Sequence, residues 1–138
     1  MIGDEINCLK NIGPIQLSNA NSQCQSLNAS QILPRNSQES DDLVLALLSM
    51  NLSSYSEKVL VSIGIYKTKG IWYDTVGRRI SYSNWLPGEP DFLSGSLNYA
   101  GFRFGGVNES AGWADYGDSD ELIVICTKKA GHGKNYWI

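Results

Sequence analysis

Two segments near the start of the chain place apolar residues at helical spacing. In the first segment, Ala20, Cys24 and Leu27 follow one another at steps of four and three residues, so they share one face of a helix. Ser18 stands just before this face, where its hydroxyl can cap the first turn. The pattern predicts a short amphipathic helix that begins at Ser18.

The second helical segment follows Pro34, which separates it from the first. Asn36 and Glu39 have the spacing of a capping box, in which the two side chains cap the helix reciprocally. A wide apolar stripe comes next, formed by Leu43, Val44, Leu47, Leu48 and Met50. We therefore expect a second helix that carries this stripe.

Beyond Asn51 the helical spacing gives way to short runs that are typical of strands. Residues 59–65 are apolar and rich in β-branched side chains, as in a buried strand. Further short strands are expected at residues 70–74, 79–82, 101–104, 112–115 and 121–126. Residues 84–101 contain two prolines and three glycines, which indicates a long loop. Helices followed by strands predict an α+β fold with an antiparallel sheet.

The composition is that of a globular protein. The chain has 138 residues, of which 42% are apolar and 18% charged, so we expect one domain over residues 1–138. Its core should span about residues 8–127, followed by a tail at 128–138. The formal net charge of −3, without a cluster of basic residues, argues against a nucleic-acid partner. Apolar runs such as residues 43–48 are too short for a membrane span.

Cysteines and glycosylation sequons together favour an extracellular protein. The chain has three cysteines, and three sequons begin at Asn28, Asn51 and Asn108. A single sequon is weak evidence, because the motif is short and arises by chance. Three in one short chain favour a secreted or cell-surface protein.

The densest candidate chemistry lies in residues 85–91. Two carboxylates, Glu89 and Asp91, flank a proline there, and Asp115 follows Trp113 downstream. A cis peptide bond before proline costs only about 0.5–1 kcal/mol, and a cis bond after Glu89 would direct both acids to one side of a rigid turn. Carboxylate oxygens suit Ca2+, which takes roughly six to eight oxygen ligands. The alternative is a solvated loop without a ligand.

In their order along the chain, these features resemble the landmarks of a C-type lectin-like domain. The resemblance covers roughly residues 8–127. Its landmarks are the helix with Cys24, the leucine-rich second helix, the strands at 62–65 and 72–74, the loop at 84–91, the strand at 113–115 and Cys126. It implies two helices packed on antiparallel sheets, with a long loop region.

The resemblance also implies a disulfide between Cys24 and Cys126, the outer disulfide of the family. The inner disulfide would need cysteines near Ala100 and Asp118, so this chain lacks it. Three roles remain open for Cys8. It is buried and inert, or it pairs with a cysteine upstream of this sequence, or it links two chains into a dimer.

By the same resemblance, the chain would hold one Ca2+. The ligands would be Glu89, Asp91, Asn98 and Asp115. The family has an asparagine before the aspartate of the strand, whereas this chain has Ala114, which removes one ligand and one hydrogen bond to a sugar. Phe92 stands where many relatives carry an acidic residue for an auxiliary ion, so we expect no second Ca2+.

The function that the resemblance implies is calcium-dependent recognition of glycans or glycoproteins by a secreted or cell-surface lectin domain. The alternative is a calcium-independent module that binds a protein partner and has lost the sugar site. Ala114 and the missing inner disulfide favour this alternative, as do the aromatic residues Phe92, Phe102 and Phe104. We expect no enzyme, because the single histidine, His132, lies in the tail, so a Ser or Cys nucleophile would have no well-placed imidazole. A zinc site would also lack enough Cys and His ligands.

Overall fold

The computed structural model describes residues 7–50, 58–90, 97–105 and 111–129. Its elements are β1 (Asn7–Gln16), α1 (Leu17–Gln25), β2 (Ser30–Gln31), α2 (Ser37–Ser49), β3 (Lys58–Thr68), β4 (Ile71–Asp74), β5 (Tyr99–Gly105), β6 (Gly112–Tyr116) and β7 (Glu121–Lys129). Two helices beside a mostly antiparallel sheet confirm the expected α+β class. Neither helix in the described part of the chain is long and apolar enough to cross a membrane.

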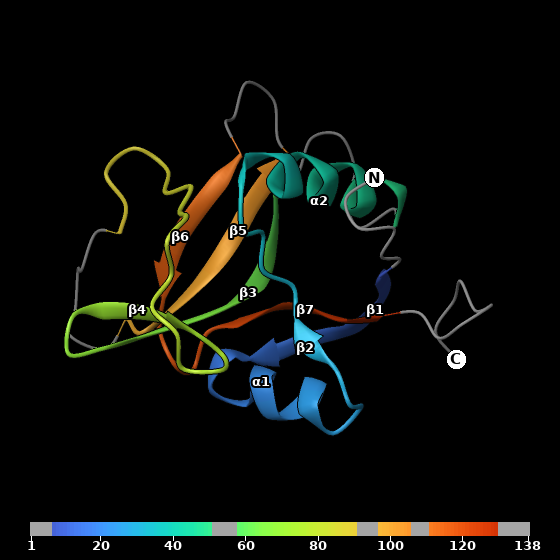
Figure 1. The fold of residues 1–138 in the computed structure, drawn as a ribbon, viewed down its shortest axis with the longest axis horizontal. Coiled ribbons are helices and arrows are strands. Elements are labelled where there is room, and N and C mark those ends of the chain that lie inside the picture. Colours follow the sequence, from blue (N-terminus) through green and yellow to red (C-terminus); the bar gives the residue numbers. More distant parts are fainter. Residues whose placement is uncertain (1–6, 51–57, 91–96, 106–110, 130–138) are drawn as a thin grey trace.

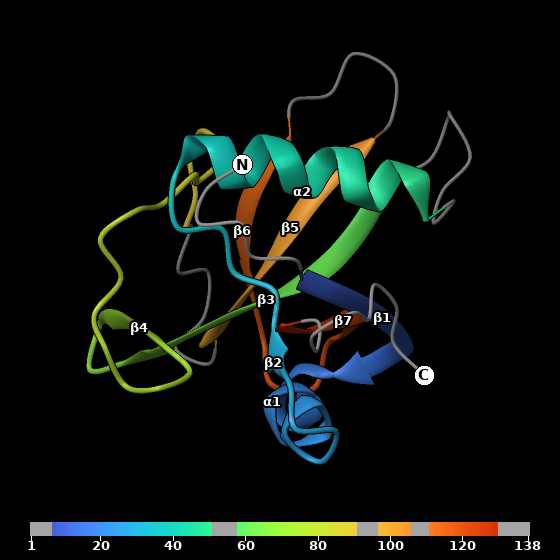
Figure 2. The same ribbon diagram turned by 45° about the vertical axis from the view of Figure 1, so that its right-hand side comes forward.

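The strands join into a single sheet in the order β1-β7-β3-β5-β6. Two strands lie off this path, because β2 pairs with β7 and β4 pairs with β3. The one parallel contact along the path is between β3 and β7, at Val61 and Ile123. Figures 1 and 2 show α1 against β1, β2 and β7, whereas α2 lies across β3, β5 and β6. The two helices therefore cover different parts of the same sheet.

The part of the molecule built from α1, β1, β2 and β7 is called the base below. Its strands β1 and β7 pair from Asn7 opposite Lys129 to Gln16 opposite Glu121. Cys24 on α1 and Cys126 on β7 form a disulfide with a Cα–Cα distance of 5.4 Å, which confirms the expected pairing. A small core surrounds it, made of Ala20, Cys24, Ala29, Val124 and Cys126.

Three details of the base differ from the sequence predictions. The strand β1 was not predicted, and β7 continues to Lys129, so the first residues of the expected tail belong to a strand. The helix α1 begins at Leu17, and Ser18 lies inside it instead of capping it. The reason is that the first turn finds backbone acceptors, since the N–H groups of Leu17 and Ser18 donate to the carbonyls of Asp120 and Asp118.

The start of α2 agrees with the predicted capping. The Asn36 Oδ1 atom accepts a hydrogen bond of 2.8 Å from the Glu39 N–H. The Glu39 carboxylate in turn accepts one of 2.8 Å from the N–H of Arg35, one residue before the expected position. On the inner face of the helix, Leu43 and Leu47 are buried in the larger core.

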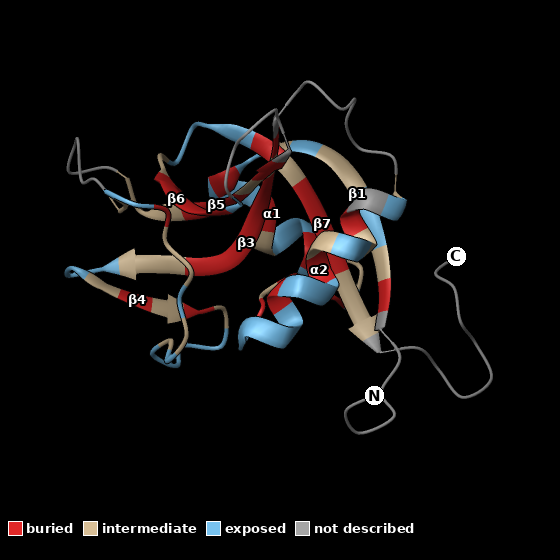
Figure 3. Cartoon of the chain, turned by 90° about the horizontal axis from the view of Figure 1, so that it is seen from above, coloured by how far each residue is buried: buried red, intermediate tan, exposed pale blue. Residues whose placement is uncertain are grey.

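That larger core lies between α2 and the sheet. Figure 3 shows buried residues along β3, β5, β6 and β7. Phe102 and Phe104 stack at 5.6 Å between ring centroids and are 0% and 3% exposed. They belong to the core, so they cannot contribute to the protein interface that the alternative function would require.

The predicted strand at residues 79–82 is wrong. Only Arg79 pairs, through an isolated bridge to Tyr73, although the N–H of Ile80 also donates to the carbonyl of Trp72. From there the chain runs on as irregular structure toward Trp85. This irregular segment leads to the start of β6, beside which the candidate site lies.

Candidate functional site

The loop with the predicted acidic residues is attached to the start of β6. The Trp113 N–H donates to the Asn84 carbonyl at 2.8 Å, and the Leu86 N–H donates to the Trp113 carbonyl at 2.9 Å. A Cβ atom at Gly112 would lie 2.8 Å from the Leu86 Cδ2 atom and 3.0 Å from the Asn84 carbonyl oxygen. Glycine is therefore needed at position 112 for the loop to approach the strand this closely.

A tight turn then brings Glu89 back toward the strand. The Glu89 N–H donates to the Leu86 carbonyl at 2.9 Å, and Gly88, at the third position, has a φ of +82°. Proline at the second position and a positive φ at the third are typical of a type II turn. The Glu89-Pro90 bond that follows is cis, as expected. Glu89 is partly buried, and its Oε1 atom is inaccessible to solvent.

Three tryptophans support this loop from below. The ring centroids of Trp72 and Trp85 are 5.1 Å apart, and those of Trp85 and Trp113 are 5.5 Å apart. Tyr82 meets Trp113 edge-on at 5.9 Å. Trp113 is fully buried and Trp72 is 9% exposed. These side chains support the loop and do not form an open surface for stacking a sugar.

Asp115 lies on β6 two residues beyond the point where the loop is attached. It is 6% exposed and stands opposite Ala100 of β5. Because side chains alternate along a strand, Asp115 shares a face with Trp113, whereas Ala114 lies on the other face opposite Gly101. Ala114 is itself buried.

Asn98 lies just before β5. Its backbone carbonyl accepts a hydrogen bond of 2.8 Å from the Lys67 N–H, which fixes this stretch of chain to β3. It stands two positions before Ala100, the partner of Asp115, so the alternation along the strand places Asn98 on the Asp115 face, diagonal to Asp115.

Tyr116 is a residue of this region that the sequence interpretation missed. Burial raises the pKa of its phenol; Arg103 lowers the pKa, and the carboxylates of Glu89, Asp120 and Asp115 raise it. Since the net shift is upward, the phenol is neutral at neutral pH and can donate its O–H. Because side chains alternate along β6, the Tyr116 ring lies on the Ala114 face of the strand, beside Gly101, and not on the Asp115 face. The only signal in the sequence was that Tyr116 directly follows Asp115.

The donor atoms at this end of β6 are of the kind that Ca2+ prefers. Glu89 and Asp115 offer carboxylate oxygens and Asn98 an amide oxygen. The fourth predicted ligand, Asp91, lies outside the described residues. Within residues 7–50, 58–90, 97–105 and 111–129, no three His, Cys, Asp or Glu side chains are grouped so that they could hold a metal ion.

The remaining predicted positions are distributed as follows. Asn28 is exposed in the turn after α1, with a φ of 57°, whereas the sequons at Asn51 and Asn108 lie outside the described residues, as does His132. Cys8 is a free thiol that is 5% exposed. Its burial favours the inert role, and nothing in the structure supports a dimer through Cys8.

Comparison with known structures identifies the fold. No family model matches the chain. The mouse scavenger receptor C-type lectin carbohydrate-recognition domain has a TM-score of 0.68 and 18% identity, covering 89% of this chain and 90% of its own. The C-type lectin CEL-I from Cucumaria echinata has a TM-score of 0.68 and 19% identity, covering 92% and 96%. Human lithostathine has a TM-score of 0.71 and 17% identity, covering 89% and 83%.

These neighbours agree on one architecture over nearly the whole length of the chain. The protein has the C-type lectin-like fold, which confirms the resemblance seen in the sequence. At 17–19% identity, the likeness establishes the fold and leaves the chemistry of the loop to be argued from this chain's own residues.

Proposed function

We propose that this protein is an extracellular lectin domain that recognises glycans through one Ca2+ held at the Glu89 turn and the end of β6. One observation carries the proposal. The loop that holds Glu89 is hydrogen-bonded to β6 at Trp113, two residues before Asp115, so a partly buried carboxylate follows a turn attached to the strand that carries a buried one. Two of the structural neighbours support it, since one is a carbohydrate-recognition domain and the other a C-type lectin.

Four residues would act as ligands of the ion. Glu89 and Asp115 would hold the ion with their carboxylates, Asn98 would add an amide oxygen, and Asp91 would complete the protein ligands. Carboxylates that lie close together repel each other, which favours binding of a cation. A bound Ca2+ supplies further coordination positions that neighbouring hydroxyls of a sugar can fill. The same carboxylates accept hydrogen bonds from those hydroxyls.

Calorimetric titration with Ca2+ tests the ion site. We expect the wild type to bind with measurable heat, and both Glu89→Gln and Asp115→Asn to weaken binding at least about tenfold, because each loses a charged ligand. Asp41→Asn is the matched control, since Asp41 is an exposed carboxylate on α2. It should bind as the wild type does. Absence of heat in a folded wild type would end the proposal.

A glycan array tests whether the protein recognises glycans, and which ones. Fluorescently labelled protein should bind a defined subset of glycans in Ca2+, and this binding should disappear in EDTA and in Glu89→Gln. Calcium binding without any glycan signal would leave the ion site intact and remove the lectin function. No catalytic step forms part of the proposal.

The calcium-independent, protein-binding module remains the second candidate. One observation favours it: the described residues contain no group of three His, Cys, Asp or Glu side chains that could hold a metal ion. The burial of Phe102 and Phe104 removes part of its earlier support. Affinity capture with the wild-type protein, with and without EDTA, separates the candidates, because a partner retained equally in EDTA would favour this module.

A further inference from the structure

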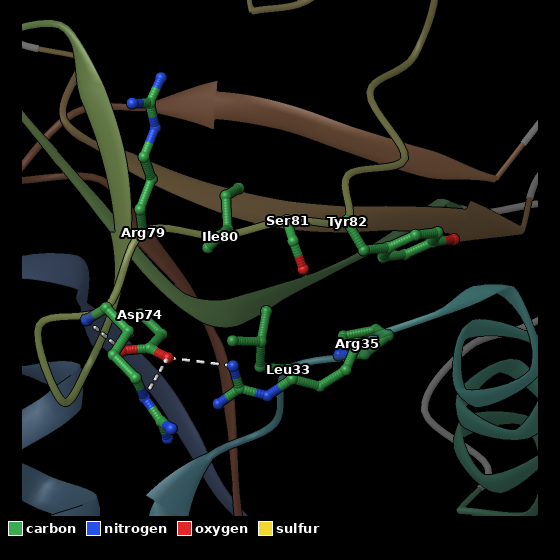
Figure 4. Close-up of a pocket in the computed structure, with 9 residues that line it drawn as sticks. Leu33, Arg35, Asp74, Arg79, Ile80, Ser81 and Tyr82 are labelled. Carbon is green, nitrogen blue, oxygen red and sulfur yellow. Dashed lines mark hydrogen bonds and ion pairs between the residues drawn. The ribbon is translucent and has the colours of Figure 1, made fainter.

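A second concave surface lies away from the Glu89 turn. Its charge is positive, whereas the Glu89 turn carries a negative carboxylate. It is a pocket of about 380 Å³ between residues 33–35, which lead from β2 to α2, and residues 78–82, which follow β4. We call it the arginine pocket, because Arg35, Arg78 and Arg79 line it together with the single carboxylate of Asp74. Figure 4 shows Arg35 reaching from one wall to Asp74, while Ile80 and Ser81 belong to the opposite wall.

Asp74 already uses both of its carboxylate oxygens. Its Oδ1 atom accepts hydrogen bonds from the N–H groups of Val76 and Arg78, at 3.1 and 2.9 Å. Its Oδ2 atom accepts one from Arg35 Nη1 at 3.0 Å and lies 3.7 Å from Arg78 Nε. The side chain is 1% exposed. Asp74 is therefore a fixed structural anion.

Three guanidinium groups against one carboxylate leave the pocket with an excess of two positive charges. This excess is local, since the whole chain carries a formal charge of −3. The side chains of Arg35 and Arg78 are 50% and 75% exposed, and each guanidinium has five N–H donors, of which Asp74 can occupy only some. Figure 4 shows the Arg79 side chain directed away from Asp74. Donors are thus left that an incoming anion can occupy.

The rest of the lining says what kind of molecule would carry that anion. Leu33 and Ile80 offer apolar surface, and Ser81 and Tyr82 offer hydroxyls. In Figure 4 the Ser81 hydroxyl points toward the wall that carries Leu33. A volume of about 380 Å³ lies at the lower end of the range for small-molecule sites, which suits a body the size of one or two sugar rings.

We propose that the arginine pocket binds a sulfate or carboxylate group carried by a sugar-sized molecule. Arg35 and Arg78 would pair with the oxyanion beside Asp74, and Arg79 would add to the attraction from the rim. Ser81 would hydrogen-bond the ligand body. Arginine suits this role, because its planar fork of donors matches the two oxygens of such a group. The site is independent of Ca2+ and of the Glu89 turn.

Nuclear magnetic resonance titration of the uniformly 15N-labelled chain in EDTA tests this pocket with the calcium site silenced. The probes are glucose 6-sulfate, glucuronate, glucose and sodium sulfate. We expect saturable shifts of the amides in residues 33–35 and 74–82 with a dissociation constant of about 1 mM for the two charged sugars, at least tenfold tighter than for glucose. Whether sulfate or carboxylate is preferred follows from the first two probes.

Three variants make the test specific. Arg35→Gln should weaken binding of glucose 6-sulfate about tenfold and Arg79→Gln about threefold, because each removes a charged donor. Arg79→Gln leaves the Asp74 contacts intact, so it remains informative if Arg35→Gln fails to fold. Lys69→Gln removes one positive charge in the exposed turn between β3 and β4, outside the pocket, and should change nothing. Glu89→Gln should also bind as the wild type does.

The possible outcomes decide the proposal in full. No saturable shift with either charged sugar overturns it, and so does an equal loss in Lys69→Gln, which would mean unspecific charge attraction. Sodium sulfate binding as tightly as glucose 6-sulfate would confirm the oxyanion and overturn the sugar-sized body. Because EDTA is present throughout, a failure of the calcium-dependent lectin proposal leaves these outcomes unchanged.

Discussion

The base and the loop region of this protein are held together by different physical means. By the loop region we mean β4, residues 75–90 and β6. The base has a disulfide that closes a separation of 102 residues, a long antiparallel ladder and a core of small side chains. The loop region has no cysteine; it depends on three packed tryptophans, on backbone hydrogen bonds at Trp113 and on the buried Asp74.

From this difference we infer that one part of the fold provides most of the stability and another part carries the recognition site. A cross-link between residues far apart in the sequence restricts the unfolded chain strongly, wherever in the molecule it lies. The geometry of the Glu89 turn instead depends on close packing around Trp113, where changes of a single methyl group are felt. A change in the base should therefore alter stability and spare the site, whereas a small change beside β6 should alter both.

The largest effect is expected from removing the disulfide. The double variant Cys24→Ala with Cys126→Ala should lower the free energy of unfolding by about 2–5 kcal/mol, because the unfolded chain regains the entropy that the cross-link removes. Urea denaturation measures the loss, and the reduced wild type serves as a control that lacks the cross-link without any substitution. Calcium affinity at low temperature, where the variant is folded, should stay within about twofold of the wild type. Loss of the ion site in a folded variant would refute the separation.

An intermediate effect is expected at the contact between the loop and β6. Gly112→Ala should lower the free energy of unfolding by about 1–3 kcal/mol, since the added Cβ meets Leu86 and the Asn84 carbonyl at contact distances that force the loop outward. The displaced turn should also weaken calcium binding, measured by calorimetry beside urea denaturation. Gly77→Ala is the comparison, because its φ of +87° strains alanine but a Cβ there meets no neighbour. It should cost stability and leave calcium binding unchanged.

The smallest effect is expected at Asp74 and depends on pH. Burial raises the pKa of Asp74, but hydrogen bonds from Arg78, Arg35 and Val76 together hold the pKa below its ordinary value. A carboxyl whose pKa is lower in the folded state stabilises the protein above its unfolded pKa of about 3.9, and this contribution is lost as the pH falls through the folded pKa. Asp74→Asn should therefore cost about 1 kcal/mol at neutral pH, a modest value because both arginines are largely exposed.

Urea denaturation of wild type and Asp74→Asn between pH 7 and pH 3 measures this dependence. The difference in the free energy of unfolding should shrink below about pH 4. Asp41→Asn, at an exposed position on α2, should show no such difference at any pH. A constant difference for Asp74→Asn would mean that the turn, and not the charge, is what the protein needs at this position.

Much of the fold could be predicted wherever the pattern is local. The apolar run at 59–65 and the stripe with Leu43 and Leu47 correspond to β3 and α2, because burial on one face imposes its period on the sequence. The strand β1 was missed, since Gly13 and Pro14 interrupt its pattern and its partner β7 lies more than a hundred residues away. Residues 79–82 have strand composition but find a partner only at Arg79, which no local pattern reveals.

The sequence named candidate ligand residues for the site, but it did not reveal which other side chains lie near them. Glu89, Asn98 and Asp115 were named from the sequence, and the loop that holds Glu89 is hydrogen-bonded to β6 at Trp113, two residues before Asp115. Tyr116 was not named, because the upward shift of its pKa comes first from burial and then from carboxylates of different segments, among them Glu89 and Asp120. Asp91 stays a prediction.

The sequence by itself determined which donor atoms this protein can offer and where its helices and most of its strands lie, because residue type and local periodicity suffice for both. Only the tertiary structure decided which of those atoms meet. Arg35 and Asp74 stand 39 residues apart and still share a hydrogen bond, and the Glu89 turn rests on Trp113 through the backbone of Asn84 and Leu86. Such contacts depend on how the sheet, the loop and the helices pack together, and no local stretch of the chain encodes that packing.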